Sequence, residues 1–385
     1  MAESEQPPPR ARLTLTDEQR LQWLMLIRSE NVGPATFRDL VNHFGSAAAA
    51  LDALPGLAAR GGVAARIRIA TRIEAEAELE AASRLGARFV AMGEPDYPPL
   101  LRALDHPPPL ICMKGSTRTL CARGVGIVGS RNASVAGQKL ASRLGRELAE
   151  AGFSIVSGLA RGIDAAAHKA SLRLGTVGVM AGGIDHPFPP EHAGLASDIV
   201  QQGGALITEM PVGWQPRATD FPRRNRLIAG LSLGLLVVEA ARRSGSLITA
   251  RLAAENGRPV FAVPGSPLDP RAEGTNHLIR TGATLVTCSE DILEGLMPMT
   301  GQDPQLPFDA GEADAPDFRR ARARDTADPV RQRIVESLGP SPCEIDDIIR
   351  FTGASPGDVQ LVLLELALAG RLERHAGNRV SLIDP

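Results

Sequence analysis

Short runs of Val, Ile and Leu alternate with helix-length segments through the middle of the chain, and this alternation restricts the possible folds more than any other feature. Gly- and Ser-rich turns follow several of the runs. Strands that are apolar on both faces, with helices between them, indicate a doubly wound and mostly parallel sheet. We therefore predict an α/β protein with strands at 125–129, 154–157, 176–181, 205–208, 235–240, 259–263 and 283–287.

Different patterns flank this core. Residues 13–85 show helical spacing, and the break at Val32-Gly33-Pro34 resembles that of a helix-hairpin-helix (SAM-like) unit. Such units often bind the DNA backbone, but Pro34 lacks an amide donor, so a structural or protein-contact role is favoured. Residues 88–115 are rich in proline and predict edge strands and loops. Beyond the core, residues 328–385 give three helix-like segments and a β-like tail, the pattern of a winged helix.

Five segments follow from these changes in pattern. We predict a disordered tail (1–12), a helical domain (13–85), an α/β domain (86–299), a linker rich in Pro, Gly and Asp (300–327) and a winged-helix domain (328–385).

Composition excludes several functional classes. The formal net charge is -2 over 385 residues, so any basic binding site must be local. The four cysteines are scattered without zinc-site or disulfide-like spacing, which fits a reducing compartment. The N-terminus lacks an apolar segment, and the apolar run 227–238 is too short for a bilayer. We expect a cytoplasmic protein with no metal, no cofactor and no membrane segment.

Positive charge is densest at residues 221–232, FPRRNRLIAGLS. An arginine cluster alone usually marks a solvated face, but this one lies between two predicted strands, which makes an anion site the sharper hypothesis. Turns with small residues follow other strands, at Gly129-Ser130-Arg131, Ser157-Gly158 and Ser244-Gly245. In open α/β sheets ligands bind at these carboxyl ends, where backbone N–H groups and arginines can meet phosphates. Any one of these glycines alone is explained by a tight turn.

Two motif matches fail on connectivity. Residues 124–129 fit GxGxxG, but the glycines precede and lie within the strand instead of opening a helix. Residues 230–234 fit GxSxG around Ser232, yet a helix precedes and a strand follows, the reverse of a nucleophile elbow. His168 is interpreted as a structural helix contact. Glu239, at a strand end, remains as a candidate catalytic acid.

The ordered set of motifs resembles the bacterial DNA-processing protein A (DprA/Smf) family. The likeness is strong from about residue 96 to 293 and weaker in both terminal domains. The motifs that carry it are Asp96-Tyr-Pro, Lys114-Gly, Gly129-Ser-Arg, Ser157-Gly-Leu-Ala-Arg-Gly-Ile-Asp164, Phe221-Pro-x-Arg-Asn-Arg, Glu239-Ala, Ser244-Gly-Ser-Leu-Ile-Thr249, Val263-Pro-Gly-Ser and Gly274-Thr-Asn.

This resemblance implies an extended Rossmann-like domain that binds single-stranded DNA and loads a RecA-type recombinase in natural transformation, without being an enzyme. Arg131 and the Arg224-Asn225-Arg226 group would line the DNA pocket, with Phe221 against a base or sugar and Arg217 as an outer phosphate contact. A homodimer would form near residues 276–287. The residues predicted to contact DNA are Gly129, Ser130, Arg131, Ser157, Gly158, Arg217, Phe221, Arg224, Asn225, Arg226, Ser244 and Gly245.

One family element is weaker here. The expected recognition helix, 355–370, has no Arg or Lys and offers only Gln360 to base edges. We therefore expect a protein contact or a modest backbone contact from Arg371, Arg374 and Arg379.

An enzyme acting on nucleotides is the alternative, because Rossmann-like phosphoribohydrolases carry a PGGxGTxxE signature. Residues 244–249 echo it distantly, with Thr249 where a catalytic Glu is needed. The sequence offers no plausible acid–base pair.

Overall fold

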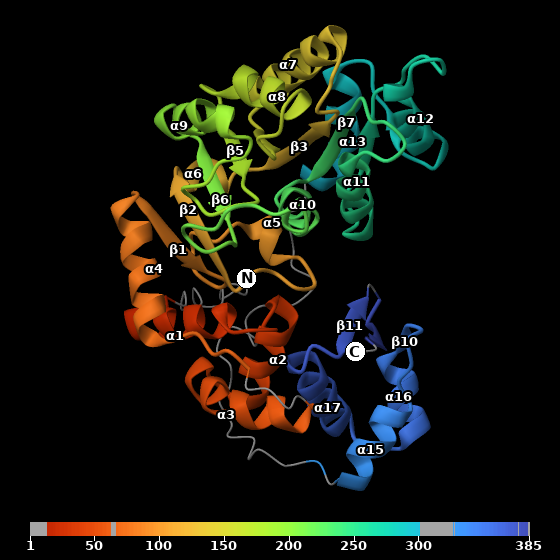
Figure 1. The fold of residues 1–385 in the computed structure, drawn as a ribbon. Helices are drawn as coiled ribbons and strands as arrows, with labels where there is room; N and C mark the ends of the chain where they lie inside the picture. Colours follow the sequence, from red (N-terminus) through yellow and green to blue (C-terminus); the bar gives the residue numbers. More distant parts are fainter. Residues whose placement is uncertain (1–13, 63–66, 301–325, 327, 376, 384–385) are drawn as a thin grey trace, which may run out of the picture. The chain divides into compact units, whose positions relative to one another are not determined.

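The structure, a computed structural model, describes residues 14–62, 67–300, 326, 328–375 and 377–383 (Figure 1). It divides into two compact units, one formed by Met1–Ala77 with Asp309–Pro385 and the other by Glu78–Phe308. The two terminal segments, predicted as separate domains, thus belong to one unit. The predicted tail and nearly all of the predicted linker lie outside the described residues.

A nine-stranded sheet forms the centre of the second unit, in the order β1-β2-β6-β5-β4-β3-β7-β8-β9. The pairs β1–β2 and β2–β6 are antiparallel, and the remaining pairs are parallel. The predicted mostly parallel sheet is confirmed, and the Pro-rich segment supplies its two antiparallel strands at one edge. The strands are β1 (Ala87–Ala91), β2 (Leu110–Gly115), β3 (Gly124–Gly129), β4 (Ser154–Ser157), β5 (Thr176–Val179), β6 (Ala205–Thr208), β7 (Gly234–Val238), β8 (Val260–Ala262) and β9 (Thr284–Leu285).

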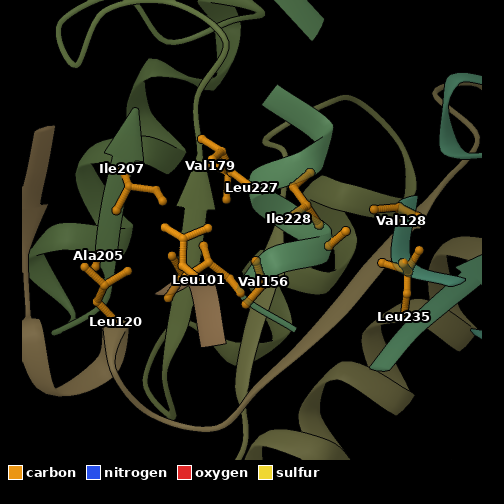
Figure 2. Close-up of a cluster of buried hydrophobic side chains, with 14 of the residues drawn as sticks. Leu101, Leu120, Val128, Val156, Val179, Ala205, Ile207, Leu227, Ile228 and Leu235 are labelled. Atoms are coloured by element: carbon orange, nitrogen blue, oxygen red, sulfur yellow. The ribbon is translucent and has the colours of Figure 1, made fainter. Parts of the chain in front are cut away.

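Helices cover both faces of this sheet because its strands are apolar on both sides. Successive side chains of a strand point to opposite faces. Along β7, Leu235 and Val237 join the core beneath α10 and α11, whereas Leu236 and Val238 join the core beneath α7 and α8. Figure 2 shows the first of these cores, with Leu227 and other α10 side chains packed on the strands.

The helices of this unit are α5 (Pro99–Arg102), α6 (Thr117–Leu120), α7 (Val135–Glu150), α8 (Ile163–Ser171), α9 (Ala193–Gln201), α10 (Asp220–Gly230), α11 (Gly245–Glu255), α12 (Glu273–Arg280) and α13 (Ser289–Thr300). Along the described chain, no helix is long and apolar enough to cross a bilayer.

The direction of winding reverses between β3 and β7. From β3 the chain proceeds through β4 and β5 to β6 on one side, then returns to β7 on the other side of β3. In open α/β sheets such a reversal leaves a crevice at the carboxyl ends of the strands. The Gly-Ser-Arg turn after β3 lies at this edge.

The first unit begins with three packed helices, α1 (Asp17–Arg28), α2 (Pro34–Phe44) and α3 (Ala47–Arg60). Thr16 and Gln19 form a capping box that fixes the start of α1. A further helix, α4 (Arg72–Arg84), runs across the division between the units.

The predicted winged helix is confirmed in the C-terminal part of the same unit. It contains α15 (Asp328–Glu336), α16 (Ile345–Thr352), α17 (Pro356–Leu368) and a sheet of β10 (Cys343–Glu344), β12 (Arg379–Leu382) and β11 (Leu372–His375) in that order. Cys343 pairs with Val380, and β10 thereby adds a third strand to the hairpin.

Helix α17, the expected recognition helix, is buried on two sides. Val359, Val362 and Leu366 pack within the winged helix, while Leu361, Leu364 and Leu368 pack into the core of α2 and α3. A helix that is apolar nearly all round is typical of such a double contact.

Ion pairs reinforce this packing. The buried Glu365 carboxylate accepts from Arg60 of α3 at 2.6 Å and from Arg331 of α15 at 2.9 Å. Arg374 pairs with Asp39 of α2 at 2.6 Å, and Arg371 donates to the Gly61 carbonyl at 3.1 Å. Arg371 and Arg374, which were expected to make outside contacts, are therefore engaged within the chain.

Candidate nucleic-acid interface

A hollow of about 120 Å³ opens at the carboxyl edge of the sheet, and we call it the rim pocket. Its lining residues are Arg131, Gly158, Ala160, Arg161, Phe188, Pro189 and Phe221. The Phe188 and Phe221 rings meet edge to face with centroids 5.3 Å apart. The Arg131 guanidinium lies 5.3 Å from the Phe221 centroid, within cation–π range.

The turn after β3 and the turn before α8 pack closely against each other beside this pocket. Gly162 has a φ of +72°, and a Cβ at this position would collide with the Ser130 carbonyl. Only glycine lets the turn before α8 pack this closely against Ser130 and Arg131. Arg131 is exposed beside this contact, whereas Ser130 is half-buried.

Arg224 differs from the prediction, because its side chain is only 7% exposed. Its Nη1 donates to the Gly158 carbonyl at 2.6 Å and to the Val179 carbonyl at 2.5 Å. Burial lowers the pKa of Arg224 to about 10, against the opposing charge of Asp164. A direct phosphate contact at Arg224 does not fit this position. The side chain instead holds the turn that forms one wall of the rim pocket.

Asp164, in the first turn of α8, also contacts the turn at Gly158. Burial raises the pKa of its carboxyl group, although Arg224 and the amides of Ala160 and Gly158 act in the opposite direction. The carboxylate accepts from the Gly158 amide at 3.1 Å. Arg224 and Asp164 thus hold the Gly158 turn through its carbonyl and its amide respectively.

Ser157 and Asn225 are also buried, contrary to the expectation of DNA contacts from their side chains. The Ser157 hydroxyl donates to the Ile127 carbonyl at 2.6 Å. The Asn225 amide oxygen accepts from Arg224 at 3.2 Å, and its nitrogen donates to the Gly245 carbonyl at 3.4 Å. Ser157 thus links β4 to β3, and Asn225 links α10 to the start of α11.

Arg226 points away from the rim pocket. Residues two apart on a helix do not face the same side. Arg226 forms an ion pair with Glu209 and donates to the His106 carbonyl at 3.1 Å. The predicted phosphate contact at Arg226 is therefore not supported by its position.

Arg217 is exposed in the loop before α10. Its guanidinium stacks on the Trp214 ring at 4.5 Å from the centroid. The Asp220 carboxylate fixes this loop, accepting from the Trp214 indole at 2.9 Å and from the Arg217 amide at 2.8 Å. An exposed guanidinium on an aromatic ring keeps N–H groups available for an outer phosphate.

The remaining predicted residues lie at or after the carboxyl ends of β3 and β7. Gly129 ends β3, where a Cβ would collide with the Val238 carbonyl of β7. Ser244 caps α11 by accepting from the Ser246 amide, and Gly245 opens that helix. Neither Ser244 nor Gly245 lines the rim pocket.

Glu239 occupies the crevice between β3 and β7. Its carboxylate accepts from the Ser134 amide at 2.8 Å and from the Ser134 hydroxyl at 2.5 Å, at the start of α7. Helix N-termini attract anions, and a carboxylate of the chain itself already fills this position. In a dinucleotide-binding fold a nucleotide phosphate occupies this position, and here the Glu239 carboxylate occupies it.

The two rejected motifs behave as predicted. The glycines of 124–129 lie in β3, and Ser232 is buried with its hydroxyl on the Ile228 carbonyl at 2.7 Å. His168 is a buried contact, with Nδ1 2.7 Å from the Thr176 hydroxyl, which itself donates to the Ile155 carbonyl. Among the described side chains, no group of His, Cys, Asp and Glu could hold a metal ion.

Sequence reasoning missed Phe188 and Arg161 as site residues. Phe188 is 42% exposed in the Pro-rich segment between β5 and α9, and Arg161 precedes α8. An exposed Phe between prolines in a loop after a strand is the signal that could have identified Phe188.

Comparisons with known proteins agree with this architecture. A family model described as DNA recombination-mediator protein A matches residues 88–297. A DprA-like N-terminal HHH domain matches residues 17–81, and a DprA winged helix domain matches residues 318–378.

Individual relatives cover most of the chain. Protein Smf of Escherichia coli (strain K12) is 40% identical over 288 residues, or 74% of this chain and 75% of that protein. Protein Smf of Synechocystis sp. is 32% identical over 396 residues, or 95% and 99%. The X-ray structure of DNA processing protein A from Streptococcus pneumoniae superposes with a TM-score of 0.59 at 32% identity, covering 73% of this chain and 98% of that one. The chain therefore belongs to the DNA recombination-mediator protein A family.

Proposed function

We propose that the chain binds single-stranded DNA at the rim pocket. One observation carries this proposal: Phe188 and Phe221 form an open aromatic pair beside the guanidinium groups of Arg131 and Arg161. Proteins that bind single strands without sequence preference combine aromatic stacking surfaces with cations that track the backbone. A base against Phe221 would leave its phosphate within reach of Arg131.

We propose single-stranded rather than duplex DNA because the bases of a single strand are exposed. Stacking on Phe188 or Phe221 requires a base face that a duplex keeps covered. The winged helix does not supply duplex recognition through α17, since that helix is buried on two sides.

Binding without catalysis is part of the proposal. The candidate acid Glu239 is held by Ser134, and Thr249, at the position where the alternative needs a glutamate, is buried. The rim pocket also lacks a carboxylate among its lining residues. General acid–base chemistry needs a positioned proton donor or acceptor beside the reacting bond.

Loading of a RecA-type recombinase onto the bound strand is the further step that family membership supports. A homodimer is proposed through the late part of the α/β domain. There β9 forms one edge of the sheet, and Leu285 is 46% exposed. An exposed edge strand offers unpaired backbone groups to a second copy.

Arg131→Ala tests strand binding directly. It removes one charge-assisted contact and one cation–π partner, so affinity for oligo-dT is expected to fall about tenfold to a hundredfold. Fluorescence anisotropy at fixed salt measures the loss, and recombinase filament formation on the same strand is expected to fall in parallel. Arg118→Ala, on α6 beside the amino ends of β4 and β6, is the matched control.

Unchanged affinity in Arg131→Ala would refute binding at the rim pocket. The oligonucleotide is expected to be recovered intact after incubation. Shorter products or free base would favour the nucleotide-processing alternative instead.

A further inference from the structure

A second and larger hollow, of about 510 Å³, lies between α7 and α8. These helices run side by side on one face of the sheet (Figure 1). The α7 residues that line the hollow recur at helical spacing, so they form one face of that helix. They are Val135, Gln138, Lys139, Ser142, Arg143 and Arg146.

Small residues form part of the α8 side of this hollow. Gly162, Ala165 and Ala166 line it from the side of α8. Nearby, a Cβ on Gly145 of α7 would lie 3.5 Å from the Ala167 Cα, which shows how closely the helices pack. Lys139 of α7 and Lys169 of α8 also line the hollow, and both side chains are exposed. We call the feature the α7–α8 groove.

The α7–α8 groove is cationic. Lys139, Arg143, Arg146, Arg161 and Lys169 line it, and no carboxylate does. Three acids outside the lining pair with its arginines: Glu147 with Arg143 at 3.9 Å, Glu150 with Arg146 at 4.0 Å and Glu191 with Arg161 at 2.5 Å. In a chain with a net charge of -2, this local excess of positive charge indicates an anionic ligand.

Arg161 connects the groove to the rim pocket, because its side chain lines both. It lies two residues before α8, and it shares the rim pocket with Phe188 and the groove with the first turns of α7. From Val135 to Arg146 the α7 face extends about 16 Å, at 1.5 Å per residue. The groove is therefore long enough to hold more than one nucleotide beyond the rim pocket.

We propose that the α7–α8 groove binds the sugar–phosphate backbone of the same single strand whose bases contact the rim pocket. The inference rests on the proposed function, since it extends that binding site. The groove lining contains no Phe, Tyr or Trp side chain, and the ring of its His192 is held by a contact of 2.7 Å between Nδ1 and the Leu159 carbonyl. Contacts there are therefore to phosphates and do not depend on base identity.

The lysines permit a test on the unmodified protein, because the chain has only three: Lys114, Lys139 and Lys169. Saturating oligo-dT of about 20 nucleotides is expected to protect Lys139 and Lys169 from an amine-acetylating reagent, read by mass spectrometry. Lys114, on β2 in another part of the sheet, serves as the internal control. Equal acetylation of Lys139 and Lys169 with and without DNA would overturn the inference.

A double variant, Lys139→Ala with Lys169→Ala, gives a second readout. For single strands the slope of log affinity against log salt is about 0.7 per phosphate contact, so losing two contacts lowers it by about 1.4. If wild type and variant bind equally at 1 M salt, affinity at about 0.1 M salt falls roughly 25-fold. An oligonucleotide of about 4 nucleotides is too short to occupy both the rim pocket and the α7–α8 groove, so it is expected to bind the wild type and the double variant equally.

The outcomes separate this inference from the proposed function. If Arg131→Ala weakens binding at both lengths while the double lysine variant binds normally, the groove is not a strand site and the rim pocket is. If Arg131→Ala has no effect at either length, the proposed function itself fails. Loss of affinity in the lysine variant for an acidic peptide but not for DNA would identify a protein partner and refute the groove proposal.

Discussion

The buried guanidinium of Arg224 supports the wall of the rim pocket, and the exposed guanidinium of Arg131 forms part of its lining. Both belong to sequence motifs that suggest phosphate binding. Their different surroundings give them different roles. Arg224 is buried, donates to two backbone carbonyls and interacts with the charge of Asp164, whereas Arg131 is exposed and can bind a ligand. A buried charge needs such partners, whereas an exposed one can exchange water for a ligand.

Arg224→Met is expected to destabilise the protein by about 3–5 kcal/mol, because Asp164 becomes a buried carboxylate without its compensating charge. Urea unfolding followed by tryptophan fluorescence measures this loss. Adding Asp164→Asn should restore part of it by removing the unpaired charge. The matched control is Arg223→Met at the exposed neighbouring position, which should stay within about 0.5 kcal/mol of wild type. Wild-type stability in Arg224→Met would show that the pair is not structural.

At the scale of elements, the positions of helix α10 and strand β9 in the fold determine which contacts their side chains and backbone groups can make. Helix α10 presents Arg224 to the strand ends and Arg226 to Glu209, since the two side chains point in different directions. Strand β9 pairs with β8 and is the last strand of its sheet. Its two residues are exposed.

Leu285→Arg tests the proposed dimer. A charge on the exposed edge is expected to block edge-to-edge pairing and to yield a monomer. Light scattering coupled to gel filtration measures the mass, and Leu268→Arg, at a position that is 93% exposed outside β9, is the control. A dimer that persists in Leu285→Arg would place the contact elsewhere.

At the scale of the whole molecule, the first unit is assembled from both ends of the chain. Helix α17 contributes Leu361, Leu364 and Leu368 to the same core as Leu54 and Leu57 of α3. The ion pair between Arg60 and the buried Glu365 links the same two helices. The N-terminal helices therefore depend on the winged helix for part of their hydrophobic core.

Removal of residues 328–385 is expected to expose the apolar face of α3. Hydrogen exchange in α3 should accelerate, and binding of a hydrophobic dye should increase, because buried leucines lose their cover. Oligo-dT binding at the rim pocket, which lies in the other unit, serves as the internal control. Unchanged protection of α3 would show that the N-terminal helices are stable alone.

Sequence alone determined the alternation of strands and helices, the mostly parallel sheet, the winged helix and the rejection of the GxGxxG and GxSxG matches. These depend on local periodicity and on connectivity, which neighbouring residues specify. Gly129-Ser130-Arg131 and Phe221 could also be placed at the strand ends, because all parallel strands finish at one edge.

Only the tertiary structure decided which charged side chains face solvent. The burial of Arg224, the pairing of Arg226 with Glu209 and the meeting of Phe188 with Phe221 depend on residues far apart in the chain. The same holds for α17, whose second apolar side is covered by helices some 300 residues earlier in the sequence. A sequence pattern specifies that a side chain is apolar or charged, but its packing partner is set by the approach of separate elements, which no local pattern encodes.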